Sequence, residues 1–176
     1  NEQETEAVDE SQTTETENKI TLDASGNAAA GDQSTEDKTA EPSTLDELFG
    51  GENLSVTYTG AEIAANYMEG GYYSLDAEQG KTFVIVGIDI TNSGADEIAI
   101  DNFAKTPKFS VMVNGQEKAE EENTILPSDF ALYQETVPAG VTENTILLFQ
   151  VPDSVTSVDS LDLFVNISGT NYQITL

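Results

Sequence analysis

The most regular alternation of apolar and polar positions in the chain runs from Phe83 to Thr91. Its even-numbered positions are all β-branched and apolar, whereas its odd-numbered positions are apolar only over the first half. The even set is Val84, Val86, Ile88 and Ile90, and the odd set is Phe83, Ile85, Gly87, Asp89 and Thr91. A period of two places alternate side chains on opposite faces of a strand. A strand with this much apolar surface on both faces predicts a central position in a sheet, and the turn residues after it end it.

Other stretches along the chain also alternate with a period of two or form short apolar runs, and turn residues separate them at intervals of about 8–15 residues. They are residues 54–63, 98–100, 109–113, 131–137, 146–151, 161–167 and 172–176. The run 146–151 is apolar on both faces and predicts a second central strand, whereas the acidic residues 116–123 indicate an edge or a loop. Many short strands with almost no helix are typical of an all-β fold, an antiparallel two-sheet sandwich.

One short helical turn is predicted between residues 44 and 49. Thr44 with Glu47 three residues later fits a capping box, and Gly50 and Gly51 would end the helix. The apolar side chains of this turn would pack on the edge of the sandwich, where the folded domain would begin.

The first 43 residues differ in composition from the rest. They consist almost entirely of Glu, Thr, Ser, Gln, Asn, Asp, Gly and Ala, and all seven Phe and six Tyr lie at Phe49 or later. Such a segment cannot bury enough apolar surface to offset the entropy lost on ordering. We therefore predict a disordered acidic tether over residues 1–43 and one folded domain over residues 44–176.

The chain is strongly acidic and lacks the side chains that many catalytic sites use. Its 176 residues include 33 Asp and Glu and six Lys, with no Arg, His, Cys or Trp, and the formal net charge is −27 at pH 7. Nucleic acids and anionic lipid surfaces attract Lys and Arg, so both are excluded as partners. Without His or Cys, no Ser-His, Cys-His or zinc-His site can form. The composition still permits a hydrolase with paired carboxylates, but no motif places such a pair. We predict no enzyme and no cofactor.

No run of the sequence approaches the roughly 20 apolar residues of a membrane-spanning helix. The sequence starts at Asn1 rather than Met, and residues 1–19 contain no apolar core of a signal peptide. We expect a mature exported chain that does not itself insert into a membrane.

Three stretches of the folded part together make up a characteristic pattern of strands and turns. They are Gly80-Lys81-x-Phe83-Val84-x-Val86-x-Ile88-x-Ile90-x-Asn92, Pro138-x-Gly140 and Leu148-Phe149-x-Val151-Pro152. This pattern, over about Leu54 to Leu176, resembles a bacterial family of immunoglobulin-like lipoproteins of unknown function, related in fold to a mycobacterial immunoprotective secreted antigen. The resemblance implies an immunoglobulin-like sandwich at the cell surface, with a lipid anchor on a Cys that would precede Asn1. It implies no catalytic residues, because the family has none assigned.

Two acidic clusters raise the question of calcium binding. They are Glu117, Glu120, Glu121 and Glu122, and Asp96, Glu97 and Asp101. Calcium takes six to eight oxygen ligands, often from a loop with the order D-x-[DN]-x-[DN]-G, and neither cluster has that order. Solvated acidic loops are the better interpretation, and we assign no metal ligand.

The candidate binding residues are Tyr67, Tyr72 and Tyr73, which flank Gly70-Gly71. Tyrosines in a glycine-containing loop can form a platform for a sugar ring or a protein surface. The alternative is that one or two of them pack on the sheet while the others are ordinary exposed aromatics.

Two residues of the central strand interrupt its apolar pattern. Gly87 either permits the close approach of another segment or weakens the strand. Asp89 is expected to face solvent.

The expected function is contact rather than chemistry. We expect a non-enzymatic extracellular or cell-surface binding or accessory module, a tethered lipoprotein whose partner is an unknown protein or a cell-wall glycan. One alternative is a carbohydrate- or solute-binding module that uses the Tyr67–Tyr73 loop, and another is a calcium-stabilised structural domain. A deep cleft would favour the first alternative, and converging carboxylates would favour the second.

Overall fold

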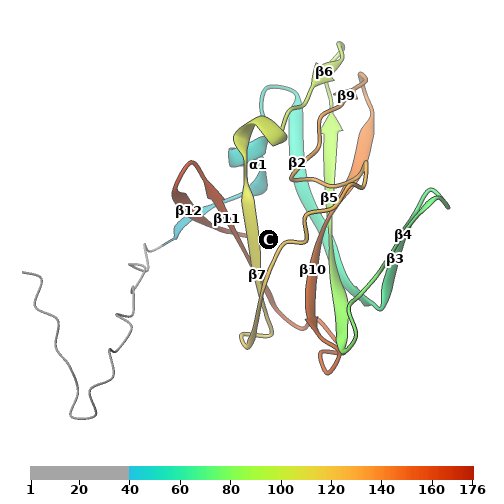
Figure 1. The fold of residues 1–176 in the computed structure, drawn as a ribbon. Helices are drawn as coiled ribbons and strands as arrows, with labels where there is room; N and C mark the ends of the chain where they lie inside the picture. The colour runs from blue at the N-terminus through green and yellow to red at the C-terminus, as the bar shows by residue number, and fades with distance from the viewer. Residues whose placement is uncertain (1–39) are drawn as a thin grey trace, which may run out of the picture. The chain divides into compact units, whose positions relative to one another are not determined.

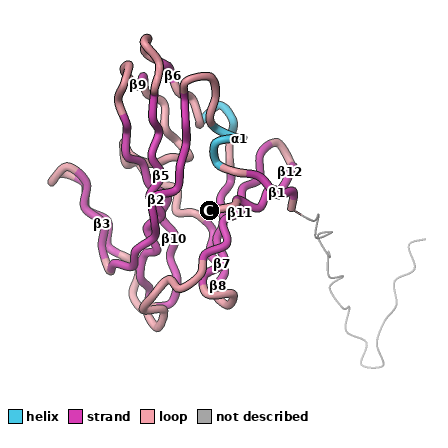
Figure 2. The backbone as a smooth tube through the Cα atoms, turned by 180° about the vertical axis from the view of Figure 1, so that it is seen from behind, coloured by secondary structure: helices cyan, strands magenta, loops and turns pink. Residues whose placement is uncertain are grey.

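The computed structural model describes residues 40–176, which form two main β-sheets packed face to face (Figures 1 and 2). The five-stranded sheet has the order β1 (Glu41–Ser43), β12 (Thr170–Ile174), β11 (Leu161–Ile167), β7 (Lys108–Val113), β8 (Glu117–Glu120). The three-stranded sheet has the order β10 (Thr142–Pro152), β5 (Lys81–Asn92), β2 (Leu54–Ala64). Two small pairs complete the fold: β3 (Asn66–Glu69) with β4 (Tyr73–Asp76), and β6 (Ile98–Ala99) with β9 (Thr136–Val137). The predicted all-β sandwich is confirmed, and its strand pairs are antiparallel except β1 with β12.

Strand β5 is the centre of its sheet, as predicted, because β10 and β2 pair with its two edges. Its even-numbered side chains point into the main core between the sheets, where Ile88 and Ile90 are almost fully buried. Its odd-numbered side chains Phe83 and Ile85 lie in a second, smaller apolar cluster on the outer face of the sheet. Both apolar faces predicted from the sequence are therefore present in the structure, and a separate cluster of apolar side chains covers each of them.

The main core contains three aromatic rings in mutual contact, one pair stacked and two pairs edge to face. Phe49, Phe109 and Phe130 contact one another with ring centroids 4.9 to 5.9 Å apart. Phe49 belongs to α1 (Leu45–Phe49), Phe109 to β7, and Phe130 to the connection before β9. Aromatic pairs at these separations stabilise a core beyond the area that they bury.

The predicted helical turn and its capping box are confirmed in α1. The backbone N–H of Glu47 donates to Thr44 Oγ1 at 3.1 Å, and the backbone N–H of Thr44 donates to the Glu47 carboxylate at 2.9 Å. Asp46 Oδ1 accepts from the backbone N–H of Val56 at 2.9 Å, which covers part of the free edge of β2. Gly50 is required after the helix because a Cβ there would lie 2.5 Å from the Asp46 carbonyl oxygen. No helix within residues 40–176 is long and apolar enough to cross a membrane.

The predicted boundary between tether and domain at residue 44 is wrong by three residues. Glu41–Ser43 form β1, which pairs in parallel with Tyr172–Ile174, and the N–H of Thr175 donates to the Ser43 carbonyl at 2.8 Å (Figure 2). Backbone hydrogen bonds to the edge of β12, rather than buried apolar side chains, hold these three residues. A prediction from side-chain composition therefore does not detect the strand. The rest of the predicted tether, residues 1–39, lies outside the described residues.

The strand predicted over residues 131–137 is only partly correct. Thr136–Val137 form β9, but Ala131 lies in a turn and Tyr133 in the irregular segment that follows it. A carboxylate organises the turn, since Asp129 Oδ1 accepts from the N–H of Ala131 at 3.1 Å. Both side chains are nevertheless buried, so the apolar alternation reported burial correctly and backbone conformation incorrectly.

Strand β10 is apolar on both faces as predicted, but it lies at the end of the hydrogen-bonded order of its sheet. Its outer edge is covered by residues 121–135, a segment that we call the strap. The N–H of Glu122 donates to the Leu148 carbonyl at 2.8 Å, and the N–H of Phe130 donates to the Ile146 carbonyl at 2.9 Å. An edge covered in this way no longer offers a template for another chain.

Replacing Ile88 or Phe149 by Ala should lower the free energy of unfolding by about 2–5 kcal/mol, the range for large-to-small core substitutions. Both side chains are at most 1% exposed in the main core. Urea unfolding followed by circular dichroism would measure the change. The control is Thr57→Ala on the exposed face of β2, which should change stability by less than about 0.5 kcal/mol. A comparably small effect at both core positions would contradict the assigned inner face.

Candidate binding groove

The hairpin β3–β4 lies to the side of the three-stranded sheet, and its tip projects away from the sheet (Figure 1). Its turn contains Gly70 and Gly71 with φ of 59° and 73°, a left-handed conformation that favours glycine. Tyr67 and Leu75 are paired across the hairpin and pack toward the sheet. They join a cluster whose fully buried members are Phe83, Ile85, Leu126 and Leu148. The apolar half of the outer face of β5 is therefore the surface on which the hairpin is seated.

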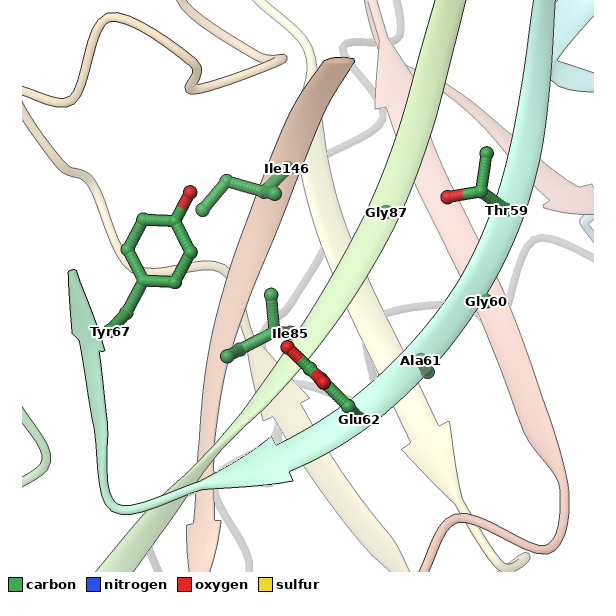
Figure 3. A pocket seen from close by; sticks show the side chains of 8 residues that line it. All are labelled: Thr59, Gly60, Ala61, Glu62, Tyr67, Ile85, Gly87 and Ile146. Carbon is green, nitrogen blue, oxygen red and sulfur yellow. The ribbon is translucent and has the colours of Figure 1, made fainter. Parts of the chain in front are cut away.

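A groove of about 330 Å³ opens between the hairpin and the sheet (Figure 3). Its lining residues are Thr59, Gly60, Ala61, Glu62, Tyr67, Ile85, Gly87 and Ile146. The Tyr67 ring stands on the hairpin side and points toward Ile146 and Ile85 on the sheet. Thr59 and Glu62 come from β2 on the opposite side. The groove thus has an aromatic wall, an apolar floor and a polar rim.

Two facing glycines make part of the floor. Gly60 pairs with Gly87 directly after a register shift in β2, and Gly60 has φ of 140°, which disfavours other residues. A Cβ on Gly87 would clash with Thr59 Oγ1, so Gly87 makes room for the Thr59 side chain of the bulged strand. Of the two interpretations of Gly87, close approach is therefore correct. The other interrupting residue, Asp89, is half-buried on the outer face and accepts from Asn144 Nδ2 at 2.6 Å.

A chain of polar contacts fixes the hairpin to the strap. Ser128 Oγ donates to Glu69 Oε2 at 2.5 Å and lies 3.5 Å from the hydroxyl of Tyr67. Tyr67 and Glu69 are two residues apart in β3 and share one face, so one serine contacts both. The position of the aromatic wall consequently depends on the strap.

The structure does not bring the three predicted tyrosines together in one platform. Tyr67 is half-buried in the groove, whereas Tyr72 and Tyr73 lie at the tip of the hairpin and are 93% and 43% exposed. This arrangement matches the alternative in which one tyrosine packs on the sheet. Sequence reasoning missed Thr59, Glu62 and Ile146, because nothing local places them opposite Tyr67. The available signal was the apolar outer face of β5, which required a cover.

The predicted acidic clusters do not form a cage. No group of three or more Asp, Glu, His or Cys side chains within residues 40–176 is placed to hold a metal ion. Asp101 accepts from Gln134 Nε2 at 2.8 Å and from the N–H of Ala104 at 2.9 Å, and these hydrogen bonds lower its pKa. Glu120 lies 3.8 Å from Lys118 at the surface. The predicted solvated loops are thus an incomplete description, because one member of the clusters, Glu121, turns inward.

Glu121 and Asp129 form a pair of acids inside the strap, of which Asp129 is buried and Glu121 is half-buried. Asp129 is only 3% exposed, and its Oδ2 accepts from Thr124 Oγ1 at 2.6 Å. Burial raises the pKa of Glu121 to about 8, and the neighbouring Asp129 carboxyl adds to the rise. This shift favours the protonated form of Glu121, in which the two carboxyl groups do not repel each other.

No protein-family model matches the chain, and neither does any curated protein. Similar solved structures include an uncharacterized β-sandwich protein from Clostridium difficile, 18% identical with a TM-score of 0.44, over 70% of this chain and 85% of that one. A conserved hypothetical protein from Bacillus anthracis is 11% identical with a TM-score of 0.39, over 71% and 89% of the two chains. A candidate lipoprotein from Bacillus subtilis is 11% identical with a TM-score of 0.38, over 72% and 37%. The names of these proteins state no ligand and no activity.

The acid pair predicts a specific dependence of stability on pH. The pKa of Glu121 in the folded chain is about 8, above its ordinary value of 4.5, so the stabilisation that it provides is complete below about pH 4.5 and is lost as the pH rises to 8. Glu121→Gln keeps the shape without the titration. We expect its free energy of unfolding to exceed that of the wild type increasingly from pH 5 to 8, by at most about 1.4 kcal/mol per pH unit.

Urea titrations at several pH values between 5 and 9 would measure this difference. Glu120→Gln, which changes an exposed neighbour, is the matched control and should follow the wild-type curve. If Glu121→Gln also ran parallel to the wild type, the two acids would not interact as described.

Substitutions of Tyr67 and Tyr72 should differ in their effect on the stability of the fold. Tyr67→Ala removes a ring that packs on the second cluster and should cost about 1–3 kcal/mol. Tyr72→Ala removes an exposed ring and should change stability by less than about 0.5 kcal/mol. Thermal unfolding of the two variants checks this order, and equal losses would place Tyr72 in the packed part of the hairpin.

Proposed function

We propose that this domain is a non-enzymatic binding module that holds a neutral ligand with hydroxyl groups, a glycan end, in the groove beside Tyr67. The observation that carries the proposal is the Tyr67 ring facing a glycine and isoleucine floor across a groove of about 330 Å³. That volume lies at the lower end of ligand pockets, which span about 300–1,000 Å³. A sugar ring suits such a site because its apolar face packs on an aromatic ring while its hydroxyls reach polar groups at the rim.

The polar rim supports hydrogen bonding to hydroxyls. Thr59 provides a hydroxyl that both donates and accepts, and Glu62 provides carboxylate acceptors. Gly60 and Gly87 leave the backbone of the floor open to close approach. No lysine lines the groove, so an anionic ligand would find no counter-charge there.

The lining favours binding over hydrolysis. Most glycosidases use two carboxyl groups that flank the scissile bond, about 5–10 Å apart. Glu62 is the one carboxylate among the lining residues of the groove. A single carboxylate is enough to orient a hydroxyl but does not make the acid and base pair of that mechanism.

We further infer that the module acts at the cell surface, as an anchored lipoprotein in a bacterium, with a cell-wall glycan or a surface protein as its partner. The support is the acidic, Ser/Thr-rich composition of the residues before Glu41 and the resemblance of the strand pattern to that of exported lipoproteins. An acidic chain of this kind extends by self-repulsion and would hold a binding domain away from an anchor.

The test is a screen of the full-length protein on a glycan array that includes bacterial cell-wall fragments. For a glycan that binds, we expect Tyr67→Leu and Glu62→Gln each to weaken affinity about tenfold, the loss of one good contact. Tyr72→Ala is the matched control and should leave binding unchanged, because that ring lies at the hairpin tip.

Three outcomes would overturn the proposal. Binding lost with Tyr72→Ala and Tyr73→Ala but kept with Tyr67→Leu would move the site to the hairpin tip. Release of a shortened glycan that Glu62→Gln abolishes would show an enzyme. The absence of any glycan that binds across the array would remove the assigned ligand class.

A further inference from the structure

The outer edge of β2 is the one long strand edge that residues 40–176 leave uncovered. In the three-stranded sheet, the strap covers the edge of β10, whereas β2 pairs with β5 on one side alone. In the five-stranded sheet, β1 covers part of β12, and β8 lies next to β10. An uncovered edge offers unpaired backbone N–H and C=O groups to a further strand.

Contacts with the segment before β2 occupy the first part of this edge. The N–H of Leu54 donates to the Gly51 carbonyl at 3.1 Å, and the N–H of Val56 donates to Asp46 Oδ1 at 2.9 Å. Both N–H groups therefore point away from β5, and both are satisfied within the chain. The part of the edge that can accept a partner begins after Val56.

The register of the sheet shows which later residues of β2 face outward. Even-numbered residues of β5 direct their backbone groups toward β10, as Asn92 does when its N–H donates to the Val141 carbonyl at 2.9 Å. The residues of β2 opposite them therefore face away from β5. They are Tyr58, Ala61 and Ile63, opposite Ile88, Val86 and Val84. Their backbone groups have no hydrogen-bond partner within residues 40–176.

The sequence of β2 does little to prevent the addition of a strand. Proteins often blunt a long edge with Pro, Lys or a bulge. The strand has one bulge, between Tyr58 and Gly60, but it contains no Pro and no Lys. Regular pairing with β5 resumes from Gly60 to Ala64. The stretch from Ala61 to Ile63 can therefore form a regular ladder with an added strand.

The inner face beside this edge is apolar. The side chains of Tyr58, Ala61 and Ile63 pack against the main core but remain half-buried. Residues directly opposite each other in an antiparallel pair share a face, so the residues of an added strand that bond to Ala61 and Ile63 would also point inward. Apolar side chains at these positions would complete the burial of the edge.

The outer face beside the same edge is polar and acidic. Thr57, Thr59 and Glu62 are exposed there, and Glu62 extends from β2 toward Ile85 (Figure 3). Neither β2 nor the hairpin β3–β4 contains a lysine, and the whole chain has 33 acidic residues against six Lys. Charge complementarity therefore favours basic side chains at the alternate positions of an added strand.

We propose that the edge of β2 from Tyr58 to Ile63 binds an extended segment of a partner protein in which apolar and basic residues alternate. Main-chain hydrogen bonds to Ala61 and Ile63 hold the segment, and its basic side chains lie beside Glu62. A second copy of this chain fits less well, because two strongly acidic domains repel each other. The inference does not rest on the glycan proposal, since backbone pairing rather than the Tyr67 ring provides the contact.

The test titrates the full-length, ¹⁵N-labelled protein with a blocked peptide of sequence Lys-Val-Lys-Val-Lys-Val. Amide chemical shifts are followed at about 150 mM salt, which screens non-specific attraction. We expect saturable shifts at Tyr58, Ala61 and Ile63, and slower hydrogen exchange of these amides. N-methylation of the three valines removes the N–H groups that face β2 and should weaken binding more than about tenfold. N-methylation of the three lysines, whose N–H groups face away, is the matched control and should leave binding unchanged.

Variants of the protein test the same edge from the other side. Ala61→Pro removes an N–H that does not pair with β5 and should weaken peptide binding about tenfold. Ala61→Ser keeps this N–H and should bind as the wild type does. Glu62→Gln should weaken binding about threefold, because an exposed charge contributes little. Melting temperatures verify that each variant is folded, and the N-methylated peptides decide the question on the unaltered protein if Ala61→Pro does not fold.

Five results would overturn the proposal. The first three are the absence of saturable shifts, equal binding of the two N-methylated peptides, which would show electrostatic adsorption only, and unchanged binding by a folded Ala61→Pro. Equal affinity for the peptide Glu-Val-Glu-Val-Glu-Val would remove the basic partner. A dimer of the protein alone that Ala61→Pro abolishes, measured by light scattering, would make a second copy the occupant.

Discussion

Strand β5 buries both of its faces, and the other layers of the molecule follow from that constraint. Its inner side chains fill the sandwich core, while Phe83 and Ile85 on the outer face would each lose about 1.5–3 kcal/mol if they stayed in water. The hairpin and the strap supply the missing cover through Tyr67, Leu75 and Leu126. Beyond Ile85 the outer face changes to Gly87 and Asp89, which offer nothing apolar to cover. The groove lies where this change occurs, and its position is therefore a consequence of the pattern of β5.

The strap is the second element on which the candidate sites depend. It covers the edge of β10, encloses the acid pair of Glu121 and Asp129, and holds the hairpin through Ser128. A charge on Glu121 would be unfavourable beside Asp129, so the strap is most stable while that proton remains bound. Since Ser128 contacts both Tyr67 and Glu69, a loosened strap would disturb the wall of the groove.

Where the sequence pattern succeeded, the relevant physics was local. The alternation that predicted β5, β7 and β11 needs only the pleat of a strand and one buried face. The capping box of α1 likewise involves residues three positions apart. The pattern failed where backbone partners decided the conformation. Glu41–Ser43 became a strand by pairing with β12, and Ala131 lies in a turn because Asp129 holds its backbone N–H.

The candidate sites show the same division. The sequence by itself determined that the chain forms a β-sandwich and that β5 needs cover on both faces, whereas the expectation that so acidic a chain avoids nucleic acid and anionic lipid stays a prediction. It singled out Tyr67 but grouped it with Tyr72 and Tyr73, because residues close in sequence were the available neighbours. Only the tertiary structure placed Tyr67 opposite Glu62. These two residues come from separate strands, and sheet register and the packing of the strap, rather than local preference, bring them together.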